Sequence, residues 1–237
     1  MMASLFVRDM KRLTTAVLKL AALVEEMIQA SVRSLCDHDP VLARRVIRRD
    51  RIIDRMEVRI AEDCLRVLAL HDPVASDLRR VIAVLKINNE LERIADLAVS
   101  IAQRLLALDE DPQVVPIPED MEVMTALVVE MVRGSLDALV ETDAGRGRAV
   151  IALDDEVDHQ HRQLIDKIKT MIRVRPDRLD AGLHLFSAAG HLERIADHAT
   201  NIAEEVVYLK EGAIIRHHHG ELVGTRSFAR SARESAV

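Results

Sequence analysis

No glycine occurs among the first 133 residues of this chain, and aromatic residues make up only 2% of its 237 residues. Tryptophan is absent. Strands are enriched in aromatic and β-branched residues, so a sheet has little compositional support here. Apolar residues recur instead at the three-and-four spacing of a helix face, as in the run from Leu78 to Ile94. The sequence therefore predicts an all-α protein.

Helix-breaking residues divide the chain into six long segments. Prolines stand at 40, 73 and 176, three more lie between 112 and 118, and glycines occur at 145, 147 and 212. Asp39-Pro40 and Asp72-Pro73 each predict a helix start, because aspartate accepts hydrogen bonds at the N-cap and proline suits the first helical position. Helices of this length, roughly 40 to 50 Å, are typical of an antiparallel bundle. The expected helices are residues 5–37, 40–70, 73–108, 119–143, 146–174 and 177–211.

The sequence also repeats itself. A shift of 104 residues places Met27 on Met131 and Asp39 on Asp143, and a shift of 101 superposes Leu91–Asp96 on the identical run Leu192–Asp197. Such matches predict two copies of a three-helix unit, each able to bury its own apolar stripe. We therefore expect two tandem three-helix bundles. The expected parts are a first repeat in 1–110, a proline-rich connector in 111–118, a second repeat in 119–212 and a mobile tail in 213–237.

Each copy carries two acidic pairs with i,i+4 spacing, one on its second helix and one on its third. Residues at this spacing share one face of a helix. In an antiparallel hairpin, two residues at the same height have residue numbers whose mean is the number of the turn residue. By this rule the acids of the first copy form pairs centred on Pro73, and those of the second copy form pairs centred beside Pro176. The sequence therefore predicts four carboxylates at matching heights in each copy: Asp50, Asp54, Glu92 and Asp96, then Asp154, Asp158, Glu193 and Asp197.

Two interpretations of these acids stay open. In the first, Arg51, Arg93 and Arg194 neutralise them in ordinary exposed ion pairs, which contribute little to stability. In the second, clustered carboxylates raise one another's pKa and are held together by a cation. Oxygen ligands suit magnesium, manganese, iron or calcium better than thiolate-loving ions, and zinc stays open. Asn201 would extend the last acidic face, and His161 and His198 offer nitrogen ligands in the second copy alone.

Charge and hydropathy exclude several classes of protein. Thirty-three basic residues stand against 39 acidic ones, a net charge of −6, so nucleic acid is not an expected partner. The longest stretch without a charged residue, Ala181–Leu192, is too short to span a bilayer, and the first residues do not have the pattern of a signal peptide. Cys36 and Cys64 form neither a CxxC pair nor a disulfide framework. We expect a cytoplasmic protein.

Several of these segments resemble the PhoU family of phosphate-transport and phosphate-signalling regulators. The shared features are the turn D-P-V-A-S-D-L-R at residues 72–79 and the two L-E-R-I-x-D runs at 91–96 and 192–197, and the resemblance covers roughly residues 5–217. It implies a PhoU-like fold of two similar three-helix bundles, in a cytoplasmic protein that is often a homodimer.

The resemblance also implies a function. Members of the family are non-enzymatic negative regulators of phosphate uptake and of the phosphate-starvation response. They contact the ATPase subunit of the high-affinity phosphate ABC transporter and a sensor histidine kinase, so this chain would approach the membrane only through those partners. Some members bind divalent or iron-type metal ions at acidic pairs. The matching positions here are Asp50, Asp54, Glu92 and Asp96 in one site and Asp154, Asp158, Glu193, Asp197 and Asn201 in the other.

The first copy departs from the fuller pattern, since Leu97 and Ser100 replace His198 and Asn201, and its site is expected to be weaker. An alternative function is a carboxylate-bridged metal oxidase or metal-storage bundle. Such sites use Glu-x-x-His on two helices, and only Asp158 and His161 approximate that spacing. Direct binding of phosphate is a further alternative, although the chain has no glycine-rich phosphate loop.

Overall fold

The computed structural model describes residues 2–108 and 116–212, with side chains from residue 5. These ranges are helical with short turns and contain no strand, which confirms the predicted all-α class. Most of the expected connector (111–118) and all of the expected tail (213–237) lie outside the described residues. The helices are α1 (Met2–Cys36), α2 (Pro40–His71), α3 (Ser76–Leu108), α4 (Asp120–Glu141), α5 (Ala144–Val174) and α6 (Leu179–Glu211), with one 3₁₀ turn, η1 (Pro176–Arg178).

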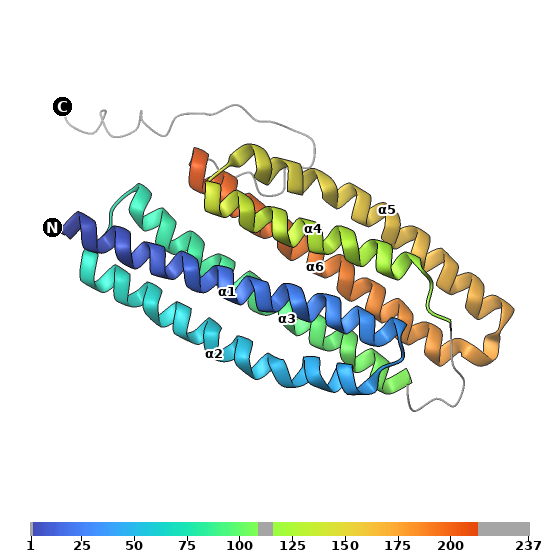
Figure 1. Cartoon of the computed structure of the whole chain (residues 1–237). Coiled ribbons are helices and arrows are strands. Elements are labelled where there is room, and N and C mark those ends of the chain that lie inside the picture. Colours follow the sequence, from blue (N-terminus) through green and yellow to red (C-terminus); the bar gives the residue numbers. More distant parts are fainter. Residues whose placement is uncertain (1, 109–115, 213–237) are drawn as a thin grey trace, which may run out of the picture.

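The helices form two three-helix bundles that lie side by side (Figure 1). The first bundle contains α1, α2 and α3, and the second contains α4, α5 and α6. Contacts between the bundles run from α3 to α6 and from α1 to α4, whereas α2 and α5 touch only helices of their own bundle. Fifteen residues of α3 are buried but only six of α2, because α3 is central and α2 is an outer helix.

The repeat seen in the sequence is reproduced in the local structure. The Asp39 carboxylate accepts from the backbone nitrogens of Val41 and Leu42 at 2.9 and 3.0 Å, which confirms it as the N-cap of α2. The Asp143 carboxylate caps α5 in the same way. An N-cap aspartate satisfies backbone donors that the first turn leaves free.

The prediction that Asp72-Pro73 starts a helix is wrong. Asp72 has φ +42° and closes α2, with its backbone nitrogen donating to the carbonyl oxygen of Leu68. The chain then turns through residues 73–75, and α3 begins at Ser76. A D-P pair occurs at helix starts, but it also occurs where a helix ends in a residue with left-handed backbone and a turn follows, because proline commonly follows a helix C-terminus.

Gly145 and Gly147 lie inside α5 rather than at a break before it. A Cβ atom on Gly147 would lie 2.9 Å from Val207 Cγ2 and 3.1 Å from the carbonyl oxygen of Ala203. The missing side chain therefore allows α5 to approach α6 closely. Among the described residues, none of the helices combines the length and apolar character that a membrane crossing requires.

Candidate functional site: two acidic clusters

Asp50 and Asp54 on α2 and Glu92 and Asp96 on α3 form a group that we call the first acidic cluster. The alignment of α2 with α3 follows the predicted turn, since the side-chain nitrogen of Asn88 donates to both the backbone and side-chain oxygens of Glu57 at 3.0 Å.

Burial and neighbouring carboxylates raise the pKa of two members of the first acidic cluster, Asp50 and Glu92. Burial, and then the charges of Asp54 and Asp96, raise the pKa of Asp50 above its ordinary value. Burial and then Asp96 raise the pKa of Glu92, against a lowering by Arg93 and with smaller contributions from Glu57 and Asp54. Such mutual effects require charges that lie near one another in a partly dry environment. The acidic faces of α2 and α3 therefore meet.

Asp154 and Asp158 on α5 and Glu193 and Asp197 on α6 form the second acidic cluster. Burial raises the pKa of Glu193, followed by the charges of all three other members, and Arg194 lowers it. Burial also raises the pKa of Asp197, with His198 lowering it and Asp158 raising it. The Thr200 hydroxyl donates to Asp154 Oδ1 at 3.4 Å and links the same two helices.

Arginines neutralise these acids only in part. Arg93 Nε lies 3.5 Å from Glu92 Oε2, so the ion-pair interpretation holds for that carboxylate. Within the part of the chain that the structure describes, no arginine or lysine nitrogen lies within ion-pair distance of Glu193 or Asp197. Exposed ion pairs therefore do not account for Glu193 and Asp197 within the described residues.

Each cluster also contains or adjoins a buried polar atom with no hydrogen-bond partner. These atoms are Asp50 Oδ1 in the first and His161 Nε2, three residues after Asp158, in the second. Burial lowers the pKa of His161 and so favours the neutral imidazole that binds metals. The donor chemistry therefore fits a hard cation. In residues 5–108 and 116–212, however, no three His, Cys, Asp or Glu side chains converge closely enough to hold a metal ion.

Asn201 and His198 contact the other bundle. The side-chain nitrogen of Asn201 donates to Glu90 Oε2 at 3.2 Å, and His198 Nδ1 lies 2.6 Å from the same oxygen. Glu90 belongs to α3, so these residues join the two repeats, and the predicted role of Asn201 as a metal ligand stays a prediction. Glu90 was not predicted from the sequence, because a comparison of the two copies finds residues that both copies share. The equivalent position of the second repeat holds His191.

An ion pair between a half-exposed lysine and a buried glutamate also crosses between the bundles. Lys86 Nζ on α3 lies 3.0 and 3.1 Å from the two carboxylate oxygens of Glu205 on α6, and its cation lies 5.9 Å from the ring centre of Tyr208. Glu205 is only 4% exposed. The pair sets the antiparallel register of α3 and α6, in which Ala95 comes level with Ala196, its equivalent in the other repeat.

The sequence profile of the PhoU domain matches residues 17–105 and again residues 121–206. The chain belongs to the PhoU family. One match falls in each repeat, and the two matches contain the two acidic clusters. The resemblance inferred from the sequence is thus confirmed.

The relatives share most of their length with this PhoU-family chain. A phosphate-specific transport system accessory protein PhoU homolog from Aquifex aeolicus is 37% identical over 90% of this chain and 96% of that protein. The homolog from Pseudomonas aeruginosa is 34% identical over 90% and 88%.

Two crystal structures have the same fold. PhoU from P. aeruginosa superposes with a TM-score of 0.83 at 34% identity, over 88% of this chain and all of that one. The phosphate transport system regulatory protein PhoU from Streptococcus pneumoniae gives 0.81 at 30% identity, over 89% and 99%. The predicted two-bundle, PhoU-like architecture is therefore confirmed.

Proposed function

We propose that this chain is a non-enzymatic negative regulator of phosphate uptake and of the phosphate-starvation response. It would act in the cytoplasm, as a homodimer, between the ATPase subunit of a phosphate ABC transporter and a sensor histidine kinase. The observation that carries the proposal is the PhoU match in both repeats, together with relatives named as phosphate-specific transport system accessory proteins. The regulatory name of the S. pneumoniae structure supports the non-enzymatic part.

A rigid two-bundle body is suited to this role. A regulator of this kind needs only to bind one conformational state of a partner more tightly than another, because differential affinity shifts the partner's equilibrium. Long packed helices present surfaces of fixed geometry, and the ion pair between Lys86 and Glu205 helps to hold the two bundles in one arrangement.

We also propose that the acidic clusters bind divalent or iron-type cations. Asp50, Asp54, Glu92 and Asp96 would hold one, and Asp154, Asp158, Glu193 and Asp197 the other, with Asn201 as a further candidate. A bound cation would supply positive charge that offsets the repulsion among the carboxylates and ties the outer helix of each bundle to its central helix. Because the described side chains do not yet converge on one point, binding requires rotamer changes.

The partner contact is tested by capture of the purified transporter ATPase on immobilised protein. The test variant carries Glu193→Ala with Asp197→Ala, and a matched control carries Asp155→Ala with Asp166→Ala, two exposed acids of α5 outside the cluster. We expect the wild type and the control to capture the ATPase and the test variant to capture less. Equal capture by all three removes the second acidic cluster from the mechanism, and no capture by the wild type overturns the adaptor proposal.

The alternative of an oxidase or metal-storage bundle is not favoured. The relatives described above are named for phosphate transport. Only Asp158 and His161 approximate the Glu-x-x-His spacing that such oxidase sites use on two helices.

A further inference from the structure

The outward face of α2 carries a row of arginines. α2 contains eight arginines and no lysine, and six of the eight follow one another at helical spacing on a single face. All six side chains are exposed, and the row extends for about 33 Å at 1.5 Å per residue. Glu62 is the acid within the row. We call this surface the arginine face: Arg44, Arg48, Arg51, Arg55, Arg59 and Arg66.

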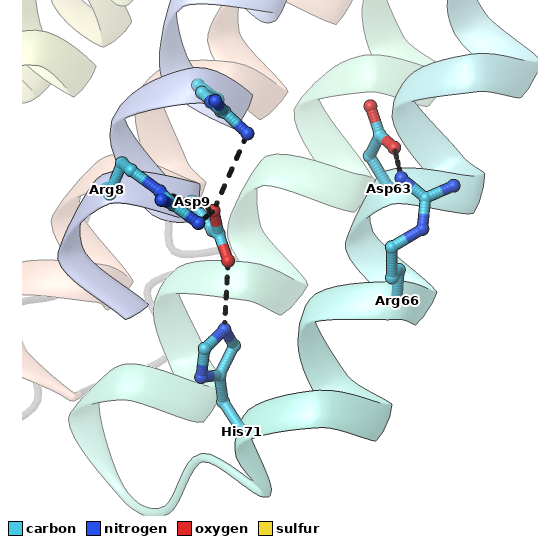
Figure 2. Close-up of polar contacts among 6 residues, drawn as sticks. Arg8, Asp9, Asp63, Arg66 and His71 are labelled. Atoms are coloured by element: carbon cyan, nitrogen blue, oxygen red, sulfur yellow. Dashed lines mark hydrogen bonds and ion pairs between the residues drawn. The ribbon is translucent and has the colours of Figure 1, made fainter. Parts of the chain in front are cut away.

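Most of this positive charge is not neutralised by the fold. Arg66 pairs with Asp63 at 2.6 Å, as Figure 2 shows. For the other five arginines, no carboxylate of the described residues lies within ion-pair distance. The chain as a whole has a net charge of −6, so this concentration of cations runs against the overall balance.

Exposed aliphatic side chains border the arginine face on both sides. Val58 and Leu65 lie along one side and are 53% and 60% exposed, and Ile52 and Leu70 lie along the other. Of the helices in residues 2–108 and 116–212, α2 contacts only α1 and α3, so within this part of the chain the face is the outer edge of the first bundle. A ridge that combines guanidinium groups with aliphatic side chains has the composition of a helix that lies on a lipid surface.

α1 continues the positive surface. A groove of about 610 Å³ runs between α1 and α2, lined by Arg8, Lys11, Arg12 and Lys19 from α1 and by Arg59 from α2. Its one acidic lining residue is Asp63, the partner of Arg66. Figure 2 shows the contact that joins α1 to the end of α2, in which Asp9 accepts from His71 at 3.0 Å and lies beside Arg8.

The second repeat shows that this fold does not require the arginines. The shift of 104 residues that relates the two copies places Arg44 on Arg148, but it places the other five arginines on residues without positive charge. Arg48, Arg51, Arg55, Arg59 and Arg66 fall on Ala152, Asp155, His159, Gln163 and Thr170 of α5. α5 has the same length within one residue and packs in the same way on its bundle. The arginine face therefore serves something other than folding.

We propose that the arginine face, with the adjoining groove, binds the surface of an anionic lipid membrane. Guanidinium groups pair with phosphate oxygens through two parallel hydrogen bonds, and rows of four to eight basic residues on one helix recognise anionic headgroups. The outer helix presents the six arginines of this face to a flat surface at once, and the bordering aliphatic side chains reach the headgroup boundary. This binding would hold the protein on a membrane without a protein partner and goes beyond the regulatory function proposed above.

The test is sedimentation of the full chain with vesicles, which contain no protein and so leave the proposed function untouched. Wild type is expected to bind vesicles of equal parts phosphatidylcholine and phosphatidylglycerol and to leave pure phosphatidylcholine vesicles unbound. Salt at about 1 M, where the screening length is about 3 Å, should release it.

A variant with Arg48→Gln, Arg51→Gln, Arg55→Gln and Arg59→Gln should bind the anionic vesicles about 100-fold or more weakly, since each basic residue near such a surface contributes about fivefold. The matched control removes four exposed cations elsewhere, Arg162→Gln, Lys169→Gln, Arg173→Gln and Lys210→Gln, and should bind as the wild type does. The first variant is expected to fold, because α5 packs in the same way without arginine at the four matching positions, and circular dichroism checks this. The lipid and salt dependence of wild-type binding is measured without any variant.

Absence of wild-type binding to anionic vesicles overturns the proposal, as does equal binding by the wild type and the arginine variant. Arginine-dependent retention on immobilised polyglutamate without binding to vesicles assigns the face to an acidic protein surface and also overturns it.

Discussion

The negative charge of the Glu193 carboxylate destabilises the folded protein. Burial and three neighbouring acids raise its folded-state pKa above the ordinary value of 4.5. A raised pKa favours the protonated form, so the stability linked to this group is present at low pH and is lost as pH rises through the folded-state pKa. Glu193→Gln should therefore stabilise the metal-free protein at pH 7 by up to about 1 kcal/mol, and the gain should vanish below about pH 4.

Thermal unfolding in a chelator at a series of pH values measures this effect. Asp155→Asn, on the exposed side of α5, is the control and should change the melting temperature little at any pH. A destabilising effect of Glu193→Gln at pH 7 would show that the charged carboxylate is favoured by its surroundings, contrary to the geometry of the second acidic cluster.

Bound metal should reverse the sign of the stability change that Glu193→Gln causes. If cations bind the clusters, Mg²⁺, Mn²⁺, Fe²⁺ or Ca²⁺ at 100 times the dissociation constant should stabilise the wild type by about 2.7 kcal/mol for each occupied cluster. The variant with Glu193→Gln and Asp197→Asn should lose most of the metal-dependent stabilisation that the second cluster provides. Glu92→Gln should lose most of the metal-dependent stabilisation that the first cluster provides. Melting curves with and without each ion, with elemental analysis of protein purified without chelator, decide this. No response to any ion, and no bound metal, would refute it.

The acids of both clusters could be found from sequence because they occur twice at fixed spacing about a turn. The side chains that join the bundles could not be found in this way. Glu90 and Lys86 have no charged equivalents of the same kind in the second copy, where His191 and Ser187 stand. Their partners lie more than 100 residues away on α6, and no local pattern brings them together.

At the scale of elements, the Asp72-Pro73 dipeptide has two interpretations, as the start of α3 or as the end of α2, and a substitution at Asp72 distinguishes them. Asp72 has a left-handed backbone, which glycine adopts without strain. Asp72→Gly should therefore stabilise the protein by about 0.5 to 1 kcal/mol, whereas loss of an N-cap would destabilise it. Asp39→Ala, at the true N-cap of α2, should cost about 1 kcal/mol. Urea denaturation measures both, and a destabilised Asp72→Gly variant would contradict the assignment.

The packing of α3 on α6 depends on a buried charge. Lys86→Met should destabilise the protein by about 1 to 3 kcal/mol, because the buried carboxylate of Glu205 loses the ammonium of Lys86. Lys86→Met with Glu205→Leu should recover most of the loss, since the pair is replaced by apolar groups. Arg148→Ala, which breaks an exposed pair with Glu211, is the control and should cost less than about 1 kcal/mol. Additive effects of the two changes at 86 and 205 would show that the residues do not interact.

Helix number and approximate bounds were predictable, because proline and apolar periodicity are local signals. The error at Asp72 and the interpretation of Gly145 and Gly147 as helix breakers have a common cause. The same residue types serve at a helix end, at a turn and at a close approach of two helices, and only the neighbouring element decides between these uses.

At the scale of the whole molecule, the two repeats differ in what their outer helices present to solvent. The acidic clusters are shared and lie between an outer and a central helix, but five of the six arginines of the arginine face occur on α2 alone. A chain that duplicated for packing reasons alone would not keep five exposed arginines in one copy and none at the matching positions in the other. The first repeat therefore carries a surface function that the second does not share.

The interface between the bundles predicts how a single repeat behaves. α3 meets α6, its own equivalent, in an antiparallel register centred on Ala95 and Ala196, and α1 meets α4. Two copies of the first repeat could therefore rebuild the six-helix array around a true two-fold axis. Residues 1–110 alone should form a homodimer, whose unfolding midpoint rises with concentration. Light scattering coupled to size exclusion measures the mass. A folded monomer with a concentration-independent midpoint would show that α3 needs no partner on the face that now contacts α6.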